Sequence, residues 1–154
     1  MATQQTTQET IIEHIRRDHR KTDREILELE LRLHKHGDEE LGPVFAPMKK
    51  ELLGHMAAEE EHLYPLLEKG EARHLIADAR KEHAAIRKQL EELAAGGKME
   101  RTEWSRRLQL LKQEIEHHVT EEEGQVLAAA RRVFDDRQLR ELGARFERAE
   151  TASG

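Results

Sequence analysis

Apolar residues recur along most of this chain at alternating steps of three and four positions, the period of a helix that buries one face. A capping box, Thr10-Ile-Ile-Glu13, marks where the first such segment begins. The four long predicted helices run from Thr10 to about His34, from between Leu41 and Met48 to Gly70, from about Ala72 to Ala95, and from about Thr102 to Val133. A shorter fifth helix is expected from Asp135 or Asp136, with Leu139, Leu142 and Phe146 as its packing face.

This pattern predicts an all-α fold, an up-down-up-down four-helix bundle with a short fifth helix at the C-terminal end. We expect a flexible N-terminus at residues 1–9, the bundle at residues 10–134, the C-terminal helix packed on it at residues 135–150, and a tail at residues 151–154. Pro65 removes the backbone hydrogen bond to the Glu61 carbonyl, so the second helix is expected to bend or end soon after His55 and Glu59.

Polar residues interrupt each of the four long stripes. The first and third stripes each contain one histidine, His19 and His83, and the second and fourth each contain a His-x-x-x-Glu pair, His55/Glu59 and His118/Glu122. Side chains four positions apart lie on one helical face, so an imidazole and a carboxylate can reach a common point. The spacing repeats, with 36 positions from His19 to His55 and 35 from His83 to His118. At a rise of about 1.5 Å per residue, the four histidines lie at comparable heights in the predicted bundle.

Six inward polar side chains at one height favour a metal site over a metal-free core. Burying an ion costs several kcal/mol, whereas a whole domain has only about 5–15 kcal/mol of net stability, and bound cations would offset that cost. Nitrogen and oxygen ligands without sulfur suit iron, manganese or zinc, and two carboxylates able to bridge suit a dinuclear centre. We therefore predict metal ligation by His19, His55, Glu59, His83, His118 and Glu122.

His62 is a further candidate, because it follows His55 by seven residues on the same stripe. We expect it to line the cavity or support a ligand, with direct ligation as the alternative. A ferritin-type site would use Glu59/His62 and Glu114/His117, but Glu114 and His117 lie off the fourth stripe, and the first and third helices present histidine rather than glutamate.

The remaining chemistry-bearing residues are predicted to lie outside the site. His118/Glu122 is preferred to His117/Glu121, which points about 100° away on a helix. The other histidines, His14, His34, His36 and His74, are expected to be solvated. The runs Glu59–Glu61 and Glu121–Glu123 are expected to be solvated apart from one inward member each, and Tyr64 and Trp104 are expected to pack rather than relay electrons.

Composition narrows the class of protein. The chain has 154 residues, of which 38% are charged and 3% aromatic, and this is typical of one domain built from amphipathic helices. It has no cysteine, which excludes disulfides, iron–sulfur clusters and thiolate zinc sites. The formal charge of −6 gives no reason to expect nucleic acid or an anionic membrane as partner. We expect a cytoplasmic protein, because neither a signal peptide nor a membrane-spanning run is evident.

The order His19, His55-x-x-x-Glu59, His83, His118-x-x-x-Glu122, with Glu60-Glu-His-Leu-Tyr-Pro65 and Glu82 beside it, resembles the hemerythrin-like family of HHE cation-binding domains over about residues 11–133. The resemblance implies an up-down four-helix bundle that holds two iron ions, bridged by the two carboxylates and an oxo or hydroxo group. Such centres bind or react with dioxygen, peroxide or nitric oxide. The family's oxygen carriers have a second histidine one turn along the third helix, where this chain has Ala79 and Arg87 on either side of His83. This difference weakens an oxygen-carrier role.

Three functional hypotheses follow. The leading one is a di-iron protein that senses, stores or detoxifies a small diatomic or peroxide ligand. The second is a di-iron enzyme with catalase-like or iron-oxidising activity, although no catalytic residue or substrate pocket can be named. The third is a metal-free helical interaction module, for which no protein partner can be identified.

Overall fold

The computed structural model describes residues 8–35, 40–96 and 99–153, and every regular element in these ranges is helical, as predicted. The long helices are α2 (Ile11–His34), α3 (Gly42–His62), α5 (Arg73–Ala94) and α6 (Arg101–Glu121). Two short helices, α4 (Tyr64–Leu67) and η1 (Gly70–Ala72), lie between α3 and α5. A π-helical segment, η2 (Glu122–Val126), and α7 (Leu127–Val133) continue α6, and α8 (Asp136–Ser153) follows.

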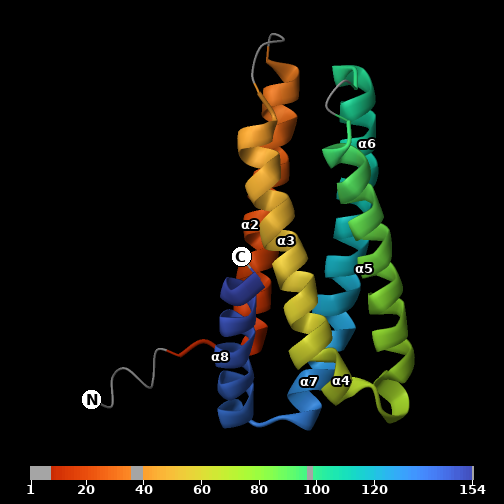
Figure 1. Ribbon diagram of the computed structural model, residues 1–154. Helices are drawn as coiled ribbons and strands as arrows, with labels where there is room; N and C mark the ends of the chain where they lie inside the picture. Colours follow the sequence, from red (N-terminus) through yellow and green to blue (C-terminus); the bar gives the residue numbers. More distant parts are fainter. Residues whose placement is uncertain (1–7, 36–39, 97–98, 154) are drawn as a thin grey trace.

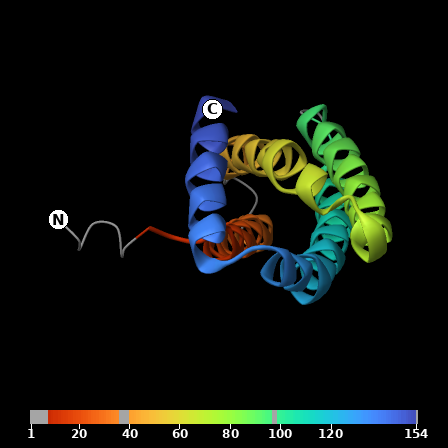
Figure 2. The same cartoon turned by 90° about the horizontal axis from the view of Figure 1, so that it is seen from below.

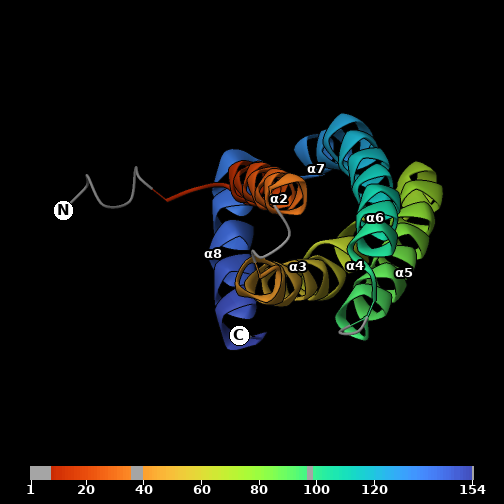
Figure 3. The same cartoon turned by 90° about the horizontal axis from the view of Figure 1, so that it is seen from above.

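The long helices run side by side and enclose a common interior (Figures 1 and 2). Helix α2 packs on α3, α5 packs on α6, and contacts of α2 with α6 and of α3 with α5 close the ring. Helix α8 lies outside this ring against α2 and α3, as the view from above makes clear (Figure 3). In the described ranges, no helix combines the length and the apolarity that crossing a bilayer requires.

Local chemistry accounts for the helix ends. The Thr10 hydroxyl accepts from the Glu13 backbone N–H at 3.1 Å, and the Glu13 carboxylate accepts from the Thr10 N–H at 3.0 Å, so the predicted capping box forms. The second helix was expected to reach Gly70 but ends at His62. Pro65 cannot donate a backbone hydrogen bond, and the chain resumes as the short α4 after Leu63.

The fourth predicted helix is helical to Val133 but changes its hydrogen bonding at Glu122. There the chain forms one π-helical segment, which contains Gly124. A π-helical turn inserts an extra residue and re-aims the side chains beside it, and such turns are frequent at functional sites.

The core consists of two apolar clusters separated by a polar layer. One cluster combines the start of α2 with α4, α7 and α8, and includes Ile11, Tyr64 and Phe146. The other cluster lies at the opposite end of the bundle. It combines the C-terminal halves of α2 and α5 with the N-terminal parts of α3 and α6, and it includes Leu29 and Trp104. Trp104 packs edge-to-face on Phe45, which agrees with its predicted packing role. Between the clusters, each long helix turns histidine or glutamate inward.

Candidate metal centre

The six predicted ligand residues lie together in the polar layer. His19 comes from α2, His55 and Glu59 from α3, His83 from α5, His118 from α6 and Glu122 from the start of η2. Each is at most 6% exposed, and Glu59, His83 and Glu122 are fully buried. Because every one occupies a stripe position that would otherwise be apolar, helix packing alone carries these side chains inward.

These residues form two overlapping groups. His19 and His55 belong to one group and His83 and His118 to the other, and the donor atoms within each group lie within 4.8 Å of one another. Glu59 and Glu122 belong to both groups. Two cations placed side by side would therefore each find two imidazoles and share two carboxylates.

The Nε2 atom of each of the four inner histidines faces the carboxylate of Glu59 or Glu122. The distances are 3.0 Å from His19 to Glu122 Oε1, 3.4 Å from His55 to Glu59 Oε1, 3.1 Å from His83 to Glu59 Oε1 and 3.6 Å from His118 to Glu122 Oε2. The Nε2 atoms of His83 and His118 are also only 3.1 Å apart. All four nitrogens thus converge on one small volume.

The Nδ1 atom of each of these four histidines lies against a second carboxylate, farther from the interior, which we call its outer carboxylate. The pairs are Asp18 with His55 at 2.8 Å, and Glu60 with His83, Glu82 with His118 and Glu123 with His19, each at 2.7 Å. Asp18, Glu60 and Glu82 each come from the long helix that precedes the helix of their histidine. Glu123, from η2 at the end of the bundle, pairs with His19 of the first long helix and closes the cycle. A neutral imidazole that donates its Nδ1–H in this way presents a bare Nε2, which is the form that binds a metal.

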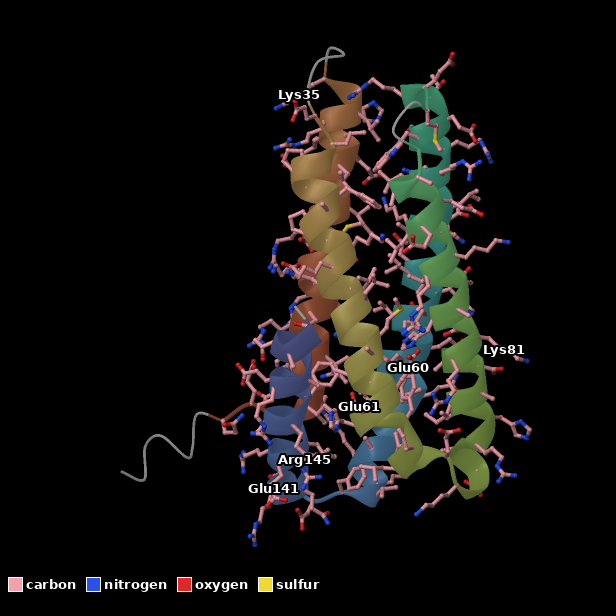
Figure 4. The ribbon with its side chains drawn as sticks, in the orientation of Figure 1. Lys35, Glu60, Glu61, Lys81, Glu141 and Arg145 are labelled. Atoms are coloured by element: carbon pink, nitrogen blue, oxygen red, sulfur yellow. The ribbon has the colours of Figure 1, made fainter. Side chains whose placement is uncertain are left out.

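Two of these outer carboxylates correct the sequence analysis. Glu60 and Glu123 belong to the charge runs that were expected to be solvated, but their side chains are only 22% and 33% exposed. Figure 4 shows Glu60 on α3 beside α5, and Arg87 of α5 donates to both Glu60 oxygens at 2.7 and 2.8 Å. Glu61, 71% exposed, follows the prediction. One feature of the sequence is shared by all four outer carboxylates: each is the immediate neighbour in sequence of an inward residue.

The donor atoms of the six inner residues are better suited to binding a cation than to forming hydrogen bonds with one another. Among the described residues, five buried atoms of this layer lack a hydrogen-bond partner: Nε2 of His19 and of His55, both oxygens of Glu59, and Oε1 of Glu122. These atoms also belong to the groups of donors that lie within 4.8 Å of one another, so they are available to a shared cation. Leaving buried ions uncompensated costs several kcal/mol each. Cations held by nitrogen and oxygen would remove that cost.

Electrostatics in the cation-free chain agrees with this fit. Burial opposes charging of His83, but the Glu59 carboxylate, 3.1 Å from its Nε2, and the Glu60 carboxylate, which accepts from its Nδ1, outweigh that effect and raise the pKa of His83 to about 9. Burial likewise opposes ionisation of Glu59, yet the positive charge of His55 holds the pKa of that carboxyl well below its usual range. Protons on imidazole thus supply the positive charge that the carboxylates require, and bound cations would displace them.

Tyr64 belongs to the site, although the sequence analysis assigned it to packing alone. Its side chain is fully buried, and its hydroxyl donates to Glu122 Oε2 at 2.5 Å and lies 3.2 Å from His83 Nε2. Burial raises the pKa of Tyr64 well above its ordinary value, and the charge of Glu122 adds to the effect. The phenol therefore stays neutral and able to donate. The helix break before Pro65 starts α4 at Tyr64, and this signal was available in the sequence.

The remaining histidines that the structure describes fall into three groups by their exposure. His62 lies outside both groups, with a side chain 30% exposed and Nε2 3.9 Å from Glu61. His117 is 62% exposed, as predicted, and His34 and His74 are also exposed. His14 was expected to be solvated, but it is 3% exposed and bonds Glu150 of α8 at 2.6 Å, so that prediction was wrong. His36 lies outside the described residues.

Two small hollows flank the inner donors. One, of about 10 Å³, is lined by His19, His55 and apolar residues including Met56 and Ile115. The other, also about 10 Å³, is lined by Ala79, Glu82, His118 and Glu122 among others. Each has the volume of about one water molecule. Only a ligand of very few atoms would fit beside the donors without movement of the helices.

Comparison with known families agrees with this geometry. The sequence model described as hemerythrin HHE cation binding domain matches residues 10–130, a span that contains all six inner residues and the four outer carboxylates. Comparisons with curated proteins and with solved structures find no match.

Proposed function

The chain belongs to the hemerythrin HHE cation-binding domain family, and we propose from this premise that it holds a dinuclear iron centre and uses it to bind or react with a small oxidant. In this proposal α2, α3, α5 and the α6–α7 continuation form the up-down-up-down bundle expected from the sequence. His19 and His55 would hold one cation and His83 and His118 the other, and Glu59 and Glu122, which belong to both groups of donors, would serve both.

The observation that carries this proposal is the set of buried donor atoms without hydrogen-bond partners among the described residues. Four nitrogens with outer carboxylates behind them, together with two shared carboxylates, supply more donors than one cation would use. Manganese and zinc also suit such donors, and the family resemblance favours iron. Iron in this place would supply the redox chemistry that reactions with dioxygen, peroxide or nitric oxide require.

The surrounding residues orient the proposed ligands and exclude bulk water. The outer carboxylates hold the four imidazoles in their ligating orientation and make their Nε2 atoms stronger donors. The two apolar clusters above and below keep bulk water away from the layer. Ala79 lies one turn from His83 and lines the hollow of about 10 Å³ beside His118 and Glu122, which favours a very small ligand there.

The physiological role proposed is sensing, storage or detoxification of such a molecule. Catalase-like or iron-oxidising turnover is the second candidate, and the Tyr64 hydroxyl favours it. The neutral hydroxyl of Tyr64 places a hydrogen-bond donor beside Glu122, and such donors stabilise the charge that develops when peroxide is cleaved or reduced.

Mixing experiments test the proposal. Iron-loaded, reduced protein would be mixed in turn with dioxygen, hydrogen peroxide and nitric oxide while absorption is followed, with metal-depleted protein as the blank. We expect at least one oxidant to change the spectrum in proportion to bound iron. A stable product supports a binder, and repeated consumption of oxidant supports an enzyme. Iron-loaded protein that responds to none of the three would contradict the proposal.

A further inference from the structure

Helix α8 reaches the candidate centre through two side chains one turn apart. Phe146 is fully buried, and its ring packs edge-to-face against His14 at 5.1 Å and against His55 at 5.2 Å, measured between ring centroids. Glu150 places Oε1 2.6 Å from His14 Nε2 and Oε2 3.4 Å from His55 Nδ1. Glu150 of α8 thus contacts the proposed ligand His55 at Nδ1, the ring nitrogen that faces away from the inner donors.

The position of α8 is tightly defined on the same face. A Cβ atom added at Gly143 would lie 2.5 Å from the Glu9 carbonyl oxygen and 3.0 Å from the Ile11 nitrogen. Gly143, Phe146 and Glu150 are three and four residues apart and therefore share one helical face. The close approach at Gly143 fixes how far α8 lies from α2, and so where Glu150 reaches.

This arrangement makes the two halves of the centre unequal. Among the described residues, His19, His83 and His118 each have one outer carboxylate at Nδ1, whereas His55 has Asp18 at 2.8 Å and Glu150 at 3.4 Å. A cavity of about 280 Å³, lined by His14, Asp18, His55, Glu147 and Glu150 among others, opens on this side. The family match ends at residue 130, before α8 begins at Asp136.

We propose that α8 is a clamp for the cation held by His19 and His55, and that Glu150 is its positioning residue, acting through His55 and His14. The inference rests on the proposed dinuclear centre and adds that its two cations are held unequally. Glu150 shares the back of His55 with Asp18, and its bond to buried His14 keeps it there. His83 and His118 lie against Glu60 and Glu82 instead, and among the described residues neither has a hydrogen bond, an ion pair or a ring contact with α8.

The coupling is reciprocal by thermodynamic necessity. Docking of α8 tightens the cation beside His55, and that cation in turn holds α8 in place. Removing a carboxylate behind a metal-bound histidine typically lowers metal affinity about 10–100-fold. Because Asp18 remains, we expect the lower end, about tenfold, for the loss of Glu150.

The test uses full-length protein loaded anaerobically with Fe²⁺ alone and titrated with a chromophoric chelator. Glu150→Ala should make one of the two iron equivalents about tenfold easier to remove and leave the other unchanged. Glu150→Gln keeps the side-chain volume and a hydrogen-bond acceptor, so it should lie between Glu150→Ala and wild type. It also keeps the test valid if the alanine variant does not fold. Glu147→Ala, which removes an exposed charge from the same cavity one turn earlier, should match wild type.

Hydrogen exchange of the α8 amides provides a readout that a purely structural role would not change. Fe²⁺ should slow this exchange in wild type and Glu147→Ala, and should slow it less in Glu150→Ala. The inference is overturned, with the proposed function intact, if both equivalents weaken together, if Glu147→Ala matches Glu150→Ala, or if Fe²⁺ leaves α8 exchange unchanged. A third iron equivalent lost in Glu150→Ala would also overturn it, because His14, Asp18 and Glu150 would then bind a cation themselves. Wild type that takes up no Fe²⁺ overturns both proposals.

Discussion

Two adjacent histidines on α6 provide a matched pair for testing the site. His118 is 5% exposed, and its Nε2 lies 3.1 Å from His83 Nε2 and 3.6 Å from Glu122 Oε2. The side chain of His117 is 62% exposed and directed to the outside, where it meets Glu82 at 3.2 Å. Substituting each with alanine removes the same side chain from neighbouring positions of one helix, so intrinsic helix propensity contributes almost equally to both variants.

The two expected magnitudes differ widely. Loss of a residue behind a ligand costs about 10–100-fold in metal affinity, so loss of a ligand itself should cost more than about 100-fold. At about 1.4 kcal/mol per tenfold, this exceeds roughly 2.8 kcal/mol. An exposed polar pair is worth about 0–1 kcal/mol, and exposed His117 contributes at the low end of that range through its contact with Glu82. His117→Ala should therefore change affinity by less than about fivefold.

The assay is anaerobic Fe²⁺ binding in competition with a chelator, with circular dichroism to establish that both variants are folded. Strong iron loss in His118→Ala and near-wild-type binding in His117→Ala would support the assignment. The reverse pattern in two folded proteins would show that α6 presents its other face to the centre and would refute the reasoning.

Three further predictions concern Tyr64, the charge state of His83 and the seat of α8. Tyr64→Phe removes the hydrogen bond to Glu122, so chelator competition should show cation binding weakened by about tenfold or more; unchanged affinity would limit Tyr64 to packing. The folded-state pKa of His83, about 9, exceeds the ordinary 6.5, so this group's stabilisation of cation-free protein is complete below about pH 6.5 and is lost as pH rises through 9. Melting temperatures of cation-free protein should therefore fall across that window, whereas those of cation-loaded protein should not; parallel curves would contradict this. Gly143→Ala should lower the free energy of unfolding by about 1–3 kcal/mol, because the new methyl group meets backbone atoms. Gly42→Ala is the control, because Gly42 has open space around it and the change should not destabilise the protein. Equal melting temperatures of the two variants would argue against close packing of α8.

The inner residues could be found from sequence because helix geometry alone decides which side chains point inward. A histidine or glutamate at a stripe position within a long helix is carried to the interior, whereas His62, at the last residue of α3, stays 30% exposed. This reasoning separated His118 from His117 correctly, since a step of one residue turns a side chain by about 100°. It also placed Leu139, Leu142 and Phe146 on the buried face of α8.

The outer contacts could not be found in this way because they depend on how neighbouring helices pack. Glu60 sits at the edge of its helical stripe, and only the rotation of α3 against α5 decides that it meets His83 rather than water. His14 is buried because α8 covers it, and nothing near His14 in the sequence indicates that Glu150 will lie there. The π-helical turn at Glu122 likewise depends on tertiary packing that periodicity does not report.

The central claim is that two cations occupy the buried layer, and metal content tests it most directly. The measurement is elemental analysis of folded, full-length protein purified after growth with iron, expressed per chain. The account predicts two metal ions per chain, mainly iron. Folded protein with essentially no bound metal, and with no uptake of added Fe²⁺, would contradict it.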